Sequence, residues 1–147
     1  PGFLPVSVNH VSRASSEKEG RESPYAIDNN MRTWWEPEDG DKKPWIEVDC
    51  RNEFRMAGVR LCWAEPGLDY DAGIKPGPVR YRLEARGEKG DWTTVLDKSA
   101  SREDLLVDYQ TFHETRARRV RLTILGTAPG IRPGLIEITV FGRGLAL

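Results

Sequence analysis

The chain has 147 residues and a mass of 16.7 kDa, enough for one domain with a hydrophobic core and too few for two. Hydrophobic residues make up 38% and charged residues 31%, which excludes a disordered chain, and no apolar run approaches the roughly 20 residues of a membrane-spanning helix. The net charge of −1 and the pI near 6.2 lack the basic excess typical of nucleic-acid-binding domains, so we expect no nucleic-acid partner.

The first ten residues include Pro1 and Pro5, which disfavour regular structure, and we interpret residues 1–10 as a linker from an upstream domain. Because the sequence starts at Pro1 without Met, we expect a fragment of a longer precursor. At the other end, residues 143–147 are expected to form a short C-terminal tail.

Between these ends, apolar and polar residues alternate in short segments separated by Gly, Pro and Asp, the pattern of half-buried strands. The predicted strands run over 11–15, 45–49, 56–63, 79–85, 92–96, 105–109, 120–124 and 135–141. Only residues 24–28 are expected to make a single helical turn. About eight short strands predict an all-β fold, an antiparallel β-sandwich of jelly-roll type over residues 11–142 with adjacent termini.

The two cysteines, Cys50 and Cys62, are predicted to be free thiols. If 45–50 and 56–63 form a hairpin around a turn at 51–55, the two cysteines lie roughly 20 Å apart. A disulfide needs Cα atoms within about 7 Å. Neither cysteine lies in a C-x-x-C motif, and the only histidines are His10 and His113, so no metal pair or nucleophile is expected from them.

Two connections are long, 36–44 and 64–78. The first is dense in charge and the second is rich in proline and glycine, and each is either a solvated loop or part of a binding site. The chain contains no G-x-S-x-G, H-E-x-x-H or P-loop motif, so we expect this fragment to be non-catalytic.

Oxygen-bearing side chains follow one another at short, irregular spacing in the segment 23–35. Asp28, Asn30 and Thr33 are spaced as in a loop that wraps a hard cation, which needs about six or seven oxygen ligands. A turn with local side-chain-to-backbone hydrogen bonds explains the same pattern. The residues alone leave both interpretations open.

A family resemblance appears when the segments are taken in order. The early ones are Ala14-Ser15-Ser16, Tyr25-Ala26-Ile27-Asp28, Thr33-Trp34-Trp35 and Trp45-Ile46-Glu47-Val48-Asp49. The later ones are Tyr81-Arg82-Leu83-Glu84, Asp91-Trp92-Thr93, Ala117-Arg118-Arg119-Val120-Arg121-Leu122 and the run from Leu135 to Gly142. From about Val11 to Gly142 the chain resembles discoidin-like domains, the coagulation factor type C superfamily. Within it, the chain looks most like modules of bacterial glycoside hydrolases, namely family-43 C-terminal modules and family-32 carbohydrate-binding modules.

The resemblance implies a jelly-roll sandwich with a structural calcium ion. Carried over by position, the calcium ligands are the backbone oxygen of Tyr25, the Asp28 side chain, an oxygen of Asn30, Thr33, the carbonyl of Ile136 and the carboxylate of Glu137. Such an ion would tie the first loop to the last strand, and two carboxylates would offset its charge.

The resemblance also implies a sugar site at one end of the sandwich, where an aromatic face and polar groups recognise a pyranose. The matching positions hold Glu36, Tyr70, Asp71 and Arg132, and Trp63 is expected to face outward beside them. Galactose-binding modules of this type commonly carry His at the Glu36 position, so the identity of the sugar does not transfer. Trp35 and Trp45 match core positions of the family.

We therefore expect a non-catalytic carbohydrate-binding module of a larger bacterial glycoside hydrolase, secreted, periplasmic or on the cell surface, that targets the enzyme to polysaccharide. The alternative is a structural interdomain module that packs on the upstream catalytic domain of the same chain without binding sugar. The apolar residues Phe3 and Leu4 in the linker favour such docking.

Overall fold

The computed structural model describes residues 2–145 and contains seven β-strands and two short 3-10 helices over that range. In chain order they are β1 (Leu4–Pro5), β2 (Val11–Ala14), η1 (Ser23–Ala26), β3 (Trp45–Trp63), η2 (Tyr70–Ala72), β4 (Arg80–Arg86), β5 (Thr93–Lys98), β6 (Val107–Gly126) and β7 (Leu135–Arg143). All strand pairs are antiparallel, which confirms the predicted fold class. Within residues 2–145, no helix is long and apolar enough to cross a membrane.

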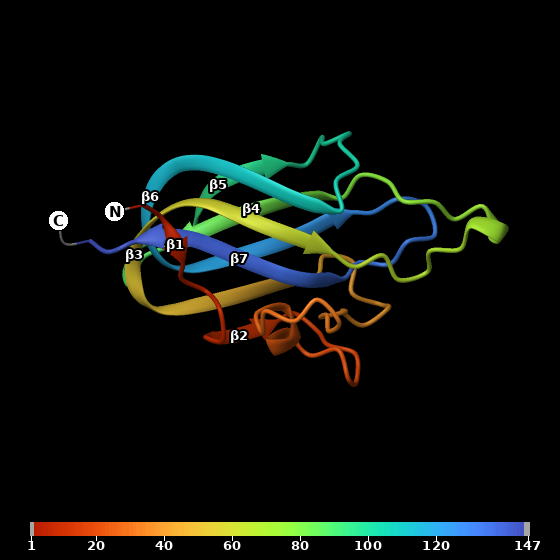
Figure 1. Cartoon of the computed structure of the whole chain (residues 1–147), viewed down its shortest axis with the longest axis horizontal. Coiled ribbons are helices and arrows are strands. Elements are labelled where there is room, and N and C mark those ends of the chain that lie inside the picture. Colours follow the sequence, from red (N-terminus) through yellow and green to blue (C-terminus); the bar gives the residue numbers. More distant parts are fainter. Residues whose placement is uncertain (1, 146–147) are drawn as a thin grey trace.

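Two long, bent strands, β3 and β6, run through both layers of the sandwich (Figure 1). The first part of β3 pairs with β2 and with the second part of β6, which continues to β4 and β5. We call this layer the five-stranded sheet. The second part of β3 pairs with β7 and with the first part of β6, and β1 adds to β7, which makes the four-stranded sheet.

The predicted hairpin between 45–50 and 56–63 is wrong, because these segments are two halves of one strand and do not pair with each other. The register shifts between Asp49 and Phe54, and Arg51 has a φ of 70°, so the hydrophilic stretch bends the strand without reversing it. Likewise, 105–109 and 120–124 were expected as separate strands, whereas β6 runs continuously from Val107 to Gly126. The two cysteines are nevertheless free, as predicted, and both are buried.

The core lies between the two sheets, where the inward side chains of each strand meet. Ile46, Val48, Leu83 and Leu122 come from the five-stranded sheet and are fully buried or nearly so. Each such side chain contributes about 1.5–3 kcal/mol through burial. Trp35 is also completely buried, as expected, but Trp45 is only partly buried because it points away from the core together with Glu47 and Asp49.

The N-terminal stretch that we interpreted as a linker is attached to the sandwich from Leu4 onward. Leu4 and Pro5 pair with Gly142 and Phe141, and the amide of Val6 donates to the carbonyl of Val140 at 2.9 Å. Arg143, which was expected in the C-terminal tail, is the last residue of β7. Pro1 and residues 146–147 lie outside the described residues. β1 and the end of β7 lie together at the end opposite the projecting 64–78 loop (Figure 1).

Candidate functional site

The loop end of the sandwich, opposite β1, is organised by the buried Trp35. Its backbone exchanges two hydrogen bonds with Leu135 at the start of β7, each 2.9 Å, and its indole N–H donates to the carbonyl of Ser16 at 2.9 Å. These bonds tie the 16–36 region to the last strand. Trp34 and Glu36, on either side of Trp35, are thereby placed at this end, where Trp34 is half-buried and Glu36 is buried.

The Glu36 carboxylate is the centre of a polar cluster. It is 4% exposed and accepts hydrogen bonds from Lys18 Nζ at 2.6 Å, Arg132 Nε at 3.1 Å and Trp34 Nε1 at 3.2 Å. Burial alone raises the pKa of Glu36, but these hydrogen bonds outweigh it and hold the pKa below its ordinary value. Lys18 also pairs with Asp39 at 2.7 Å. The cluster is therefore charged and hydrogen-bonded.

Trp34 supplies an aromatic surface beside this cluster. The guanidinium carbon of Arg21 lies 3.4 Å from the centroid of the Trp34 ring, so Arg21 covers one face of the indole. The ring is half-buried, and its N–H is held by Glu36. Sequence reasoning did not identify Lys18 or Arg21, because nothing in the linear pattern joins them to Trp34.

The base of the 64–78 loop packs on the turn before β7. The amide of Arg132 donates to the carbonyl of Pro66 at 2.8 Å. Gly67 has a φ of 94°, and a Cβ at this position would lie 2.6 Å from the carbonyl oxygen of Gly130. A glycine is required here because the two loops touch backbone to backbone.

The tip of the same loop is held by Asp69. Its side chain accepts from the amides of Asp71 and Ala72 at 3.1 and 3.2 Å, and its carbonyl accepts from the amide of Ile74 at 2.8 Å. Tyr70 is therefore presented on an ordered turn, with 65% of its surface exposed.

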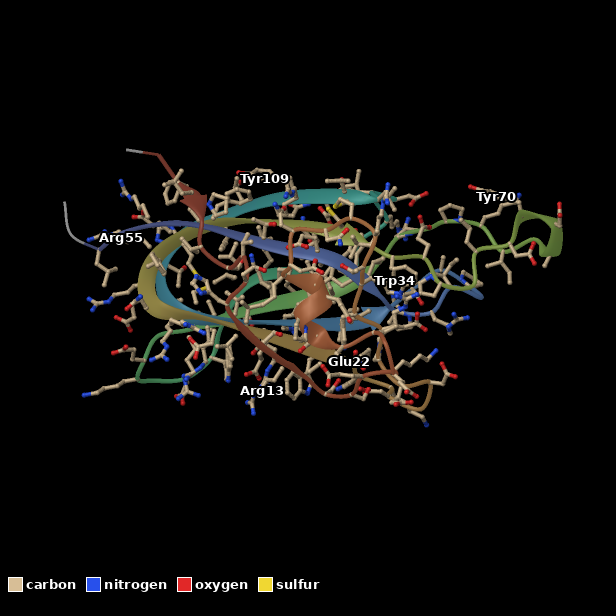
Figure 2. The ribbon with its side chains drawn as sticks, turned by 60° about the horizontal axis from the view of Figure 1, so that its bottom comes forward. Arg13, Glu22, Trp34, Arg55, Tyr70 and Tyr109 are labelled. Atoms are coloured by element: carbon tan, nitrogen blue, oxygen red, sulfur yellow. The ribbon has the colours of Figure 1, made fainter. Side chains whose placement is uncertain are left out.

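The structure brings together only some of the predicted sugar-binding residues. Glu36 and Arg132 are in direct contact, whereas Tyr70 and Asp71 belong to η2 at the far tip of the loop, well away from Trp34 (Figure 2). The prediction that Trp63 faces outward is wrong. Its side chain is 3% exposed and packs against Tyr81 with ring centroids 5.4 Å apart, because the end of β3 is apolar on both faces.

The predicted calcium ligands of the first loop converge on the hydroxyl of Thr33. This oxygen lies 2.6 Å from Asp28 Oδ2, 3.1 Å from the carbonyl oxygen of Asn30 and 3.4 Å from that of Tyr25. The local hydrogen bonds of the alternative interpretation are also present, since Asp28 Oδ1 accepts from the amide of Asn30 at 3.0 Å. Oxygens from four residues of one loop therefore gather in a small volume.

Glu137 reaches the same loop from β7, where Ile136 precedes it. Its Oε1 accepts from the amide of Asn29 at 3.1 Å, while its buried Oε2 has no hydrogen-bond partner among the described residues. Burial, together with the nearby charge of Asp28, raises the pKa of Glu137 to about 7. A buried, half-satisfied carboxylate beside a second carboxylate fits a hard divalent cation.

The sequence from residue 11 to residue 138 matches the family model of the F5/8 type C domain. The chain belongs to this family. A search of curated proteins gave no match. The F5/8 type C family consists of non-catalytic binding modules, which agrees with the expectation that this fragment is not an enzyme.

Carbohydrate-binding modules are among the solved structures similar to this F5/8 type C domain. Chitosan-binding module 2 of a Paenibacillus sp. IK-5 chitosanase/glucanase, in complex with chitotriose, has a TM-score of 0.77 and 24% identity, covering 93% of this chain and 99% of that one. The family 32 module of Clostridium perfringens NanJ, in complex with galactose, has a TM-score of 0.75 and 19% identity, and the match covers 95% of this chain and 98% of that one.

A similar fold is also found inside a whole enzyme. The family 89 glycoside hydrolase of C. perfringens has a TM-score of 0.78 and 20% identity, with 97% of this chain covering 15% of that one. At these identities the likeness shows that the fold is shared.

Proposed function

We propose that this domain is a carbohydrate-binding module that binds a neutral or amino sugar at its loop end and holds a secreted or cell-surface bacterial glycoside hydrolase close to polysaccharide. The observation that carries the proposal is the Glu36 cluster, in which a carboxylate, Lys18, Arg132 and the Trp34 ring meet at the end opposite β1. Aromatic faces flanked by charged hydrogen-bonding groups suit the apolar face and hydroxyls of a pyranose.

The arrangement supports weak binding with limited contact. One half-buried ring and a few hydrogen bonds correspond to a dissociation constant near 1 mM, or about −4 kcal/mol. Tyr70 and Asp71 stand apart on the projecting loop, so they contact only a saccharide long enough to extend along it. Weak binding is useful in a tethered module, because the tether raises the effective concentration of the attached enzyme at the polymer surface.

The test is an NMR titration with galactose, chitotriose and xylotriose that follows the indole N–H signal of Trp34. The expected result is a shift of this signal with at least one sugar, weakened by Arg132→Gln. Arg116→Gln, an exposed arginine on the bend of β6, is the matched control and should bind as the parent does. Tyr70→Ala should affect only longer oligosaccharides. The absence of any shift at Trp34 with these sugars would refute the loop-end site.

We also propose that calcium is the structural cofactor of the domain. Asp28, Thr33, Glu137 and the carbonyl groups of Tyr25 and Asn30 would hold it, with the Ile136 carbonyl as a further ligand from β7. The support is the orphaned Glu137 Oε2 facing a loop whose oxygens already converge. A bound divalent cation supplies positive charge there and ties the loop that precedes Trp34 to β7, so its role is to position the loop end.

A second candidate function is docking of the module onto the upstream catalytic domain. Val107 is 52% exposed and Tyr109 55%, and Tyr109 packs on Phe141, the strand partner of Pro5. Apolar side chains of β1, β6 and β7 thus gather on one outer surface. This candidate is favoured if the sugar titration fails and if β1 exchanges its amide hydrogens more slowly in the enzyme-attached module than in the isolated one.

A further inference from the structure

A separate cleft of about 440 Å³ lies on the outer face of the five-stranded sheet, away from the loop end. Its charged lining comes from Arg13, Glu47, Asp49, Arg86, Arg119 and Arg121. The side chains of β3, β4 and β6 point outward because they alternate with buried core residues, and Arg13 of β2 stands opposite Glu47. Figure 2 shows Arg13 on the lower side of the molecule, opposite Tyr109.

One row of side chains across the cleft is fully paired. Glu47, 4% exposed, accepts from Arg13 Nε at 3.0 Å and from Arg121 Nε at 2.7 Å. The Arg121 guanidinium lies between two indole rings, 4.8 Å from the centroid of Trp45 and 4.7 Å from that of Trp92. Cation–π contacts of this kind fix the orientation of both partners. Trp92 is thereby held as an aromatic wall of the cleft.

The neighbouring row is only partly paired. Arg86 and Arg119 stand directly opposite each other on β4 and β6, and like charges in that position repel. Arg119 reaches Asp49 at 3.4 Å, but Asp49 is already bound more closely by Arg118, at 2.8 Å. Arg86 has no ion pair with any described residue, and its buried Nε has no hydrogen-bond partner.

The cleft therefore has an excess of positive charge. Its four arginines against two carboxylates leave a net charge of +2. The buried Nε of Arg86 is out of reach of a ligand, but its terminal nitrogens are not, and a guanidinium without an ion-pair partner is a strong donor for a carboxylate. The cleft is also large enough for a ligand of several heavy atoms, with an aromatic wall against which a ring can pack.

We propose that this cleft is a second binding site, which takes a uronate residue of an acidic saccharide. The carboxylate of the sugar accepts hydrogen bonds from Arg86 and Arg119, and its ring packs against Trp92. The proposal rests on the proposed function in that the module binds carbohydrate, but it does not depend on the loop-end site. The two sites differ in the charge of the sugar they select.

The test uses three probes, which are trigalacturonic acid, the neutral trisaccharide galactotriose and sodium sulfate, with the indole N–H signals of Trp92 and Trp34 as reporters. Trigalacturonic acid should shift the Trp92 signal, and galactotriose should leave it unchanged. Arg86→Gln and Arg119→Gln should each weaken trigalacturonate binding by about ten- to a hundred-fold, the range for hydrogen bonds to a charged group. Arg82→Gln, on the same face of β4 outside the cleft lining, is the matched control and should bind as the parent does.

The possible outcomes separate this proposal from the previous one. If galactose, chitotriose and xylotriose fail to shift Trp34 while trigalacturonic acid shifts Trp92, the loop-end site is refuted and the cleft stands. Sulfate that competes with equal affinity would overturn the uronate site and leave a plain anion site. Unchanged affinity in both arginine variants would also overturn it. The melting temperature of Arg86→Gln should equal or exceed that of the parent, and a clear fall would assign Arg86 a structural role instead.

Discussion

Glu137→Gln is expected to change the stability of the domain in opposite directions with and without calcium. In metal-free protein the Glu137 side chain is fully buried, Oε2 has no partner, and Asp28 adds like charge. Because the folded protein holds the Glu137 proton more tightly than the unfolded chain does, the metal-free protein loses stability as the pH rises from about 4.5 past about 7. At pH 7 this penalty is about 3 kcal/mol.

Gln removes that charge and keeps an oxygen for the amide of Asn29, although its new N–H groups must also find partners. We therefore expect Glu137→Gln to stabilise the metal-free protein by about 1–2 kcal/mol, or roughly 3–6 °C in Tm. In the presence of calcium, the parent is expected to be more stable than the variant. An ion at a hundred times its dissociation constant stabilises the parent by about 2.7 kcal/mol, or roughly 8 °C, and the variant loses a ligand and most of this gain.

The measurement is thermal unfolding at pH 7 in EDTA and in 1 mM calcium chloride. Glu47→Gln is the control, because Glu47 is as deeply buried but paired with Arg13 and Arg121, so its variant should be destabilised equally in both buffers. A parent protein with the same Tm in both buffers would refute the calcium proposal. A variant less stable than the parent in EDTA would refute the inferred charge strain at Glu137.

Two further predictions concern the cysteines and the projecting loop. Native protein should show no thiol that reacts with a disulfide reagent at pH 8, since burial and the charge of Asp49 raise the pKa of Cys50 to about 12 and Cys62 is only 4% exposed. Denatured, unreduced protein should titrate as two thiols, and fewer than two would contradict free cysteines. Gly67→Ala should destabilise the domain by about 1–3 kcal/mol, because the new Cβ meets the Gly130 carbonyl. Gly73→Ala, which also has a positive φ but has nothing within 4 Å, should lower Tm less, and equal losses would mean that the loop contact has no role.

The strands were predictable from sequence because one face of each is buried. Ile46, Val48 and Leu122 mark the inward positions by simple alternation, and the structure buries all three. The bends of β3 and β6 were not predictable in this way. Residues 51–55 are hydrophilic, as a turn would be, and only the pairing of both halves with β6 shows that the strand continues.

The tryptophans show where the alternation of apolar and polar residues predicts the orientation of a side chain and where it does not. Trp45 is in phase with Glu47 and Asp49, a signal that could have placed it on the outer face. Trp63 lies in the apolar run 61–64, where both faces are buried, so alternation gives no orientation. The family resemblance placed Arg132 beside Glu36, but Lys18 was missed, since it lies 18 residues from Glu36 and meets it only in the folded loop, where its amide also donates to the Glu36 carbonyl.

The continuity of β3 and β6 through both sheets has a consequence for how the chain folds. Each sheet contains this one pair of strands, and the two strands are separated in the sequence by the whole segment 64–106. The chain must lose the entropy of closing so long a loop before strand pairing contributes any favourable free energy. This order slows folding in proteins dominated by non-local contacts. During synthesis from the N-terminus, β3 must wait for β6 with its apolar side chains uncovered. Because the same two strands build both layers and β7 completes the four-stranded sheet, we expect the sandwich to fold as one cooperative unit once residues up to 143 are available.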